Sequence, residues 1–278
     1  MRKIVSISSK RLLSQTLGAT ALFSVLVACS STTQIGATGV DRKQLLLVSS
    51  EQINAASAAS YNQTLSQAKA AGKLDTDAAM RSRLQRISNR LVTQVGTFRP
   101  EARSWQWEVH TIKSDELNAY VAPGGKIMFY TGIIDRLSLT DAEIAAIMGH
   151  EMAHALREHA RERVSTQMAT QSGLGILGSI AGLSTNQLQL ADMVSQVGLS
   201  LPHNRAQESE ADVLGLELMA RAGYNPQSAV SLWRKMEAAS KGAPPQFLST
   251  HPSAGNRIAQ IQSLLPRVMP LYNASSKA

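Results

Sequence analysis

Residues 139–164 read LTDAEIAAIMGHEMAHALREHARERV and carry two histidines, His150 and His154, four positions apart. An α-helix turns about 100° per residue, so these side chains lie on one face, about 6 Å apart along the axis. One metal ion can therefore contact both imidazoles. Glu151 lies beside that ion, where its carboxylate can take a proton from metal-bound water. This HExxH spacing predicts a zinc hydrolase.

The same stretch has the features of a helix. Thr140 and Glu143 form a capping box at its start. Apolar side chains recur at helical spacing and predict a buried stripe: Ile144, Ile147, Met148, Met152 and Ala155. His159, about 180° from His150 around a continuous helix, is expected on the surface. The alternative is a chance HExxH string on an ordinary core helix.

A catalytic zinc ion takes a third protein ligand and keeps one position open for water. Residues 204–222 predict a helix with Glu208 and Asp212 on one face. We expect Glu208 to bind the metal and Asp212 to accept the free N–H of a liganding histidine, most readily His150. Glu210, about 200° from Glu208, is expected in solvent. A solvated acidic face without a metal is the alternative for this helix.

Three more histidines differ in their relation to the site. Pro252 holds His251 in an extended backbone, from which it could donate to a developing oxyanion or reach an open metal position. His203 could approach the site, although its spacing does not require this. His110 lies on the polar side of a predicted strand and is expected to be structural.

Residues 1–28 have the pattern of a signal peptide. Four cations, Arg2, Lys3, Lys10 and Arg11, precede a mostly apolar stretch. Residues 26–29, Leu-Val-Ala-Cys, resemble a bacterial lipobox, which predicts cleavage before Cys29 and its lipidation. Ser30 follows, where an inner-membrane lipoprotein would carry aspartate, so we expect the periplasmic face of the outer membrane. The alternatives are a transmembrane anchor, for which the stretch is marginal, and a free buried thiol.

The cysteine and charge content argue against a disulfide-stabilised fold and against a nucleic-acid-binding protein. Cys29 is the single cysteine, so no disulfide can form within one chain. The formal net charge is +8, and half of it lies in residues 1–28, which leaves an ordinary balance for the mature part. Lysines and arginines are not clustered with aromatic residues, so we expect no nucleic-acid partner.

Outside the motif the sequence predicts an α+β fold, mainly α. Helical periodicity predicts helices over residues 50–71, 75–95, 204–222, 227–239 and 253–265. Strand patterns around a Pro-Gly-Gly turn predict a small three-stranded sheet over residues 105–111, 117–122 and 126–130. We expect a flexible tether over residues 29–40, one domain over 41–265 and a fraying tail over 266–278.

Residues 173–183, GLGILGSIAGL, are apolar and rich in glycine but too short to cross a bilayer. We expect them to form a helical hairpin with residues 186–201, either buried or facing a membrane. A lid over the cleft is the alternative.

Four ordered motifs resemble the zinc metallopeptidases related to HtpX and the CAAX prenyl proteases. They are NAYVAPGG at 118–125, HEMAH at 150–154, RAQESEAD at 205–212 and THPSAGNRI at 250–258. The motifs resemble those of the outer-membrane lipoprotein members, LoiP and YcaL, and of the catalytic domain of BepA. Long apolar spans after Cys29 and a carboxy-terminal TPR domain, found in some relatives, are not predicted here. We therefore expect neither intramembrane proteolysis nor a large docking surface.

The resemblance implies a zincin-like metallopeptidase domain with the sheet beside the HExxH helix. It implies one Zn²⁺ per chain, held by His150, His154 and Glu208, with Glu151 as the general base. Asp212 becomes the partner of a liganding histidine, and His251 a residue near the metal that stabilises the transition state or gates the site. Arg205 and Arg257 become structural or substrate-orienting residues. The resemblance also implies a substrate-binding edge strand made of Asn118, Ala119, Tyr120, Val121 and Ala122.

The expected function is a zinc endopeptidase of the bacterial envelope that is anchored at the outer membrane through lipidated Cys29. By resemblance, its substrates are extended polypeptides from unfolded or misassembled proteins, and a further partner is the envelope assembly machinery. One alternative is a zinc-stabilised assembly factor or chaperone with little proteolytic activity. Another is a zinc hydrolase of cell-wall peptides.

Overall fold

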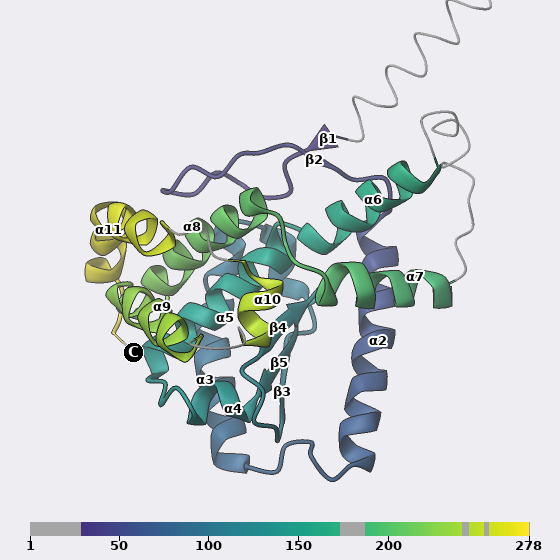
Figure 1. Cartoon of the computed structure of the whole chain (residues 1–278). Coiled ribbons are helices and arrows are strands. Elements are labelled where there is room, and N and C mark those ends of the chain that lie inside the picture. The colour runs from purple at the N-terminus through teal and green to yellow at the C-terminus, as the bar shows by residue number, and fades with distance from the viewer. Residues whose placement is uncertain (1–28, 173–186, 241–244, 253–255, 278) are drawn as a thin grey trace, which may run out of the picture.

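The computed structural model describes residues 29–172, 187–240, 245–252 and 256–277 (Figure 1). The predicted signal peptide and the apolar stretch at 173–183 lie outside the described residues. Within the described ranges, no helix combines the length and the hydrophobicity that crossing a bilayer requires.

The HExxH helix is the central element of the fold. α5 (Asp141–Leu156) begins with the predicted capping box, in which the Thr140 side chain accepts from the backbone N–H of Glu143. Every residue from 143 to 156 is buried. α5 packs against α3 (Ala78–Val92), α8 (Arg205–Arg221), α9 (Gln227–Ala239) and the sheet. The helix is thus enclosed on all sides, and the prediction of a single buried stripe was too narrow.

Two glycines let α5 and α8 pack at very short distance. A Cβ atom at Gly215 would lie 2.7 Å from the backbone nitrogen of His150, and one at Gly149 would lie 3.0 Å from the carbonyl oxygen of Gly215. Side chains at these positions would push the helices apart. The close crossing places the acidic turn of α8 opposite the two histidines of α5.

The three predicted strands form one sheet in the order β3-β5-β4. β3 (Glu108–Ile112) runs parallel to β5 (Lys126–Tyr130), and β5 runs antiparallel to β4 (Ala119–Ala122). Gly124 and Gly125 have φ angles of +83° and +88° in the turn between β4 and β5, which favours glycine there. β4 is therefore an edge strand of the described sheet, and it packs against α5. The predicted α+β fold, mainly helical with a small sheet beside the HExxH helix, is confirmed.

The described residues form three hydrophobic clusters. The largest joins the sheet to α3, α5, α8, α9 and α11 (Arg257–Ala274). A second joins α2 (Ser50–Ala70), α6 (His159–Ser172), α7 (Gln187–Met193) and the π-helical segment η4 (Val194–Ser200), which lie together on one side of the molecule (Figure 1). A third, smaller cluster joins α2 to β3 and β5. The short elements are β1 (Cys29–Ser30), β2 (Gln44–Leu45), η1 (Val95–Thr97), η2 (Pro100–Ser104), α4 (Thr131–Asp135) and α10 (Gln246–Thr250).

The HExxH helix ends earlier than the sequence predicted. Glu158 has a φ angle of +50°, in the left-handed region that non-glycine residues rarely adopt. The chain turns there and continues as α6 in a new direction (Figure 1). The angular spacing of α5 therefore does not extend to His159.

Residues 30–43, here called the strap, lie against the domain. The prediction of a flexible tether over 29–40 does not match this arrangement. The buried Glu217 carboxylate of α8 accepts hydrogen bonds from the backbone N–H groups of Ala37 and Thr38 and from the Thr38 hydroxyl, at 2.7–2.9 Å. Because these bonds satisfy a buried charge, they hold the strap on α8.

The predicted fraying tail from residue 266 is also wrong. α11 continues through Pro266 and Pro270 to Ala274. Val268 is fully buried, and α11 packs on α8 and α9. Tertiary packing thus outweighs the hydrogen bonds that the two prolines remove.

Candidate metal centre

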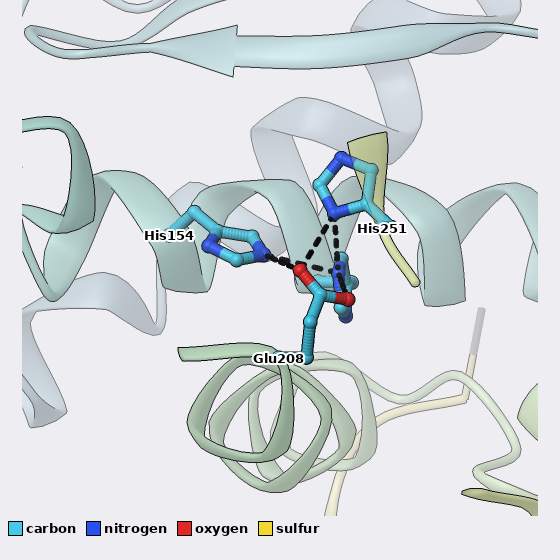
Figure 2. Close-up of side chains that lie close together, drawn as sticks. His154, Glu208 and His251 are labelled. Atoms are coloured by element: carbon cyan, nitrogen blue, oxygen red, sulfur yellow. Dashed lines mark hydrogen bonds and ion pairs between the residues drawn. The ribbon is translucent and has the colours of Figure 1, made fainter. Parts of the chain in front are cut away.

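Four buried side chains converge between α5, α8 and the end of α10. His150, His154, Glu208 and His251 each offer one ligand atom, and these atoms lie within 4.8 Å of one another. The Glu208 carboxylate rises from α8 between His154 and His251 (Figure 2), with Oε1 at 3.3 Å from His154 Nε2 and 3.0 Å from His251 Nδ1. Imidazole nitrogens together with a carboxylate oxygen form a donor set that zinc prefers, and these residues fit such an ion. The structure thus brings together the three residues predicted as ligands and His251, which was predicted to lie near the metal.

The electrostatic surroundings keep two of the donors, His154 and Glu208, in the forms that bind a metal. Burial lowers the pKa of His154 well below its usual value, so the ring stays neutral. Burial alone would raise the pKa of Glu208, but His251 and His154 outweigh it and lower that pKa. A neutral imidazole and an ionised carboxylate are the forms required of metal ligands.

The first histidine of the motif is oriented by a carboxylate. Asp212 Oδ1 lies 2.9 Å from His150 Nδ1, which leaves His150 Nε2 facing the other donors. Arg257 Nε donates to the second Asp212 oxygen at 2.7 Å, and the same guanidinium donates to Glu208. The contact expected for Asp212 is therefore present. Arg257 is buried at the site, whereas Arg205, the other predicted arginine, is exposed.

Glu151 occupies the position of a general base. Its Oε1 has no hydrogen-bond partner among the described residues and lies 3.4 Å from His251 Nε2. Burial raises the pKa of Glu151, which makes its carboxylate a better proton acceptor near neutral pH. A pocket opens beside it, with walls from β4, α5 and the loop before α8; its lining includes Tyr120, Val121, Pro123, Glu151, His154, His203 and His251.

His159 and Glu210 were expected in solvent, and both expectations are wrong. His159 is fully buried, and its Nδ1 lies 2.7 Å from His154 Nδ1. Its Nε2 lies 3.0 Å from Glu210 Oε2. The turn at Glu158 redirects the chain and carries the His159 ring back toward His154. No glycine or asparagine marks that turn in the sequence, so the local pattern held no signal for it.

The two remaining histidines have different surroundings. The His203 ring lies 4.1 Å from that of His154 and stacks on that of His251 at 4.9 Å, so it does approach the site. Burial lowers its pKa well below the usual value, and Arg163 lies 3.1 Å from its Nδ1. His110 pairs with Asp75 at 2.6 Å on β3, outside the donor cluster.

A family model described as peptidase family M48 matches residues 78–265, which contain every residue of this site. The chain belongs to peptidase family M48. The predicted resemblance to HtpX-type zinc metallopeptidases is thus confirmed at the level of the family, and zinc is the family cofactor. The M48 match leaves out the strap, although the strap contacts residues of the site through Arg42.

The relatives of this chain include mitochondrial metalloendopeptidases and bacterial proteases. It is 37% identical over 163 residues to the mitochondrial metalloendopeptidase OMA1 of Schizosaccharomyces pombe, covering 58% of this chain and 47% of the relative. It is 25% identical over 223 residues to the β-barrel assembly-enhancing protease of Yersinia pestis, covering 76% and 44%. The protein of that name from Escherichia coli K12 is 26% identical over 175 residues, covering 60% and 36%. The chain spans half or less of the length of these relatives.

Proposed function

We propose that the chain is a zinc-dependent endopeptidase that cuts extended polypeptides. One observation carries this proposal. His150, His154 and Glu208 converge from two helices, and Glu151 lines the pocket beside them. Metal donors and a base around one pocket are the parts that metal-assisted hydrolysis of a peptide bond requires.

When bound, zinc polarises the scissile carbonyl and acidifies the attacking water. Glu151 accepts the proton of that water and then delivers it to the leaving amine. Asp212 and Arg257 hold His150 and Glu208 in place during this exchange. His251 either donates to the developing oxyanion or gates the site. The placement of its Nδ1 among the four donors supports a gating role.

The edge of β4 is the proposed substrate-binding element. β4 pairs with β5 along one side and borders the pocket with Tyr120 and Val121. An extended peptide can add to such an edge as a further strand, held by main-chain hydrogen bonds that do not depend on its sequence. Unfolded proteins offer this conformation and folded ones do not, which favours them as substrates.

We also propose an envelope location, at the periplasmic face of the outer membrane. The lipobox-like residues 26–29 support it, and so does similarity to proteases whose name refers to β-barrel assembly. Cys29 is exposed at the start of β1, as a lipid-bearing residue would need to be. Unfolded or misassembled envelope proteins are then the substrates, and the assembly machinery is a partner.

The test of the catalytic proposal is Glu151→Gln, which keeps the size of the side chain and removes its basicity. We expect zinc content to stay at one per chain while the rate of casein cleavage falls by about 10²- to 10⁴-fold. A chelator should abolish cleavage by the wild type. Glu237→Gln, the same change at an exposed acid on α9, should cleave normally.

Two outcomes would reject the endopeptidase. If the zinc-loaded wild type leaves denatured casein intact, or if Glu151→Gln cleaves at the wild-type rate, the chain does not hydrolyse peptides by this mechanism. Cleavage of murein fragments in place of casein would identify a cell-wall hydrolase. Full cellular function of Glu151→Gln would support the assembly factor.

A further inference from the structure

The two histidines of the motif are oriented in different ways. His150 is bonded directly to the carboxylate of Asp212. His154 instead contacts a second imidazole, His159, which in turn contacts Glu210. We propose that His159, Glu210 and Arg42 of the strap form a positioning chain that fixes His154 for metal binding. The inference rests on the proposed metal site.

The hydrogen bonds of this positioning chain can run in only one donor-to-acceptor direction, from His154 through His159 to Glu210. His154 faces His150 and Glu208 with Nε2, so a metal-binding His154 carries its proton on Nδ1. That proton is donated to His159 Nδ1, 2.7 Å away. A neutral His159 that accepts at Nδ1 carries its own proton on Nε2 and donates it to Glu210 Oε2 at 3.0 Å. The opposite direction would put a proton on His154 Nε2 and block its lone pair.

The strap holds the far end of this chain. Arg42 Nε donates to Glu210 Oε1 at 2.5 Å, and the same guanidinium pairs with Glu162. Arg157, which is fully buried, donates to Glu210 Oε2 at 3.2 Å and to the backbone oxygen of Arg42 at 2.8 Å. Both oxygens of Glu210 are thus occupied, and its carboxylate cannot turn away from His159.

The position of the strap is set independently of the site. Its middle part is tied to Glu217, two helical turns beyond Glu210 on the same helix. Arg157 also donates to the hydroxyls of Ser31 and Thr33, near the start of the strap. These ties all precede Arg42 in the sequence. Just after it, the side-chain nitrogen of Gln44 donates to the backbone oxygen of Arg157 at 2.6 Å, so the chain is held on both sides of Arg42. A segment outside the M48 match thereby contributes to the orientation of a metal ligand.

A purely structural role for these contacts predicts something different from a positioning role. If they only hold the strap down, their loss lowers the stability of the zinc-free protein and leaves zinc affinity unchanged. If they position His154, zinc affinity falls more than the stability of the zinc-free fold explains. Partners that orient a liganding histidine typically change metal affinity by about 10- to 100-fold.

The experiment uses the full mature chain and measures zinc affinity by competition with a chromophoric chelator. His159→Phe keeps a ring and removes both nitrogens, and we expect it to weaken zinc binding by about 10- to 100-fold. Arg42→Met should weaken it less, by several-fold, because Arg157 still holds Glu210. Lys43→Met, at the exposed neighbour of Arg42, should bind zinc as the wild type does. The visible spectrum of the cobalt-substituted protein should shift in His159→Phe and not in Lys43→Met.

A double-mutant cycle tests whether the residues act as one chain. Glu210→Gln combined with His159→Phe should bind zinc no more weakly than His159→Phe alone, because the first change acts only through the second residue. Thermal unfolding of the zinc-free variants reports their stability separately. Unchanged zinc affinity in a folded His159→Phe protein, or additive losses in the cycle, would overturn the positioning chain.

The same series separates this inference from the proposed function. A wild type that binds zinc but cuts no casein removes the endopeptidase and leaves the affinity test intact. A wild type that binds no zinc overturns both. If His159→Phe loses affinity and the wild type cleaves casein, both stand.

Discussion

Glu210 shows how one buried carboxylate can stabilise the fold as well as orient a ligand. Burial acts to raise its pKa, but hydrogen bonds from His159 and Arg42 outweigh it and lower the pKa to about 2. The pKa of this side chain is thus below its ordinary value of 4.5. Such a group contributes stability that is fully present above the unfolded pKa and is lost as pH falls through the folded pKa.

We therefore expect a pH-dependent difference between the zinc-free wild type and its Glu210→Gln variant. At pH 6 the wild type should be more stable by about 2 kcal/mol, a value reduced for solvent screening of the partly exposed Arg42. The difference should narrow below pH 4.5 and be nearly gone at pH 2. Urea unfolding across this range measures it. A difference that stays constant with pH would show that the charge of Glu210 contributes nothing.

Residue spacing predicted part of the site and missed another part for one physical reason. His150, His154, Glu208 and Asp212 were found because each pair lies within an uninterrupted helix, where angular spacing holds. His159 lies beyond the left-handed turn at Glu158, so the same arithmetic misplaced it. Glu210 was misplaced because its partners come from α6 and the strap, and their approach depends on tertiary contacts.

At the scale of elements, the site depends on how closely α5 and α8 cross. Gly149 and Gly215 lie at the crossing, within one to three residues of His150 and Asp212. Any increase in the separation of the helices moves donors on both sides. Helix contact and metal geometry are thus coupled through two positions that have no side chain.

We expect a graded response when alanine replaces these glycines. Gly215→Ala places Cβ 2.7 Å from a backbone nitrogen and should lower the free energy of unfolding by about 2–3 kcal/mol and weaken zinc binding. Gly149→Ala, with 3.0 Å to its nearest neighbour, should cost less, about 1 kcal/mol. Calorimetry and zinc titration measure the two effects. A more stable Gly215→Ala protein, as helix propensity alone predicts, would contradict this role of the crossing.

Most elements were predicted because their signals are local. The capping box at Thr140, the glycine turn after β4 and the alternation of the strands all occur within a few residues. The pairing order β3-β5-β4, the continuation of α11 through two prolines and the docking of the strap depend on contacts between distant segments. A sequence pattern contains no direct record of such contacts, so these features required the structure.

At the scale of the whole molecule, the strap connects the proposed lipid anchor to the catalytic domain. Cys29 and Ser30 form β1, which pairs with β2. The strap between these two strands runs over α8. Only a short, well-held segment therefore separates the anchor from the site. With the proposed lipid on Cys29, this arrangement would favour substrates close to the membrane surface.

Fractionation of a bacterial envelope tests the anchor. We expect the wild type in the outer-membrane fraction with fatty acid attached. Cys29→Ser should lose the label, because it removes the thiol that accepts the lipid. Ser30→Asp should keep the label and move to the inner membrane. Unlabelled wild-type protein in the soluble periplasmic fraction would rule out the lipoprotein.

The left-handed turn at Glu158 also limits what an inventory of motif residues can establish. If one extra residue were inserted between Leu156 and His159, the sequence would still contain the HExxH motif and both downstream acids, Glu208 and Asp212. It would nevertheless move the His159 ring away from His154, since the turn at Glu158 sets the direction in which α6 begins. Two proteins with the same metal-binding motifs could thus differ in zinc affinity. The difference would come from the length of the turn between α5 and α6, which no motif includes.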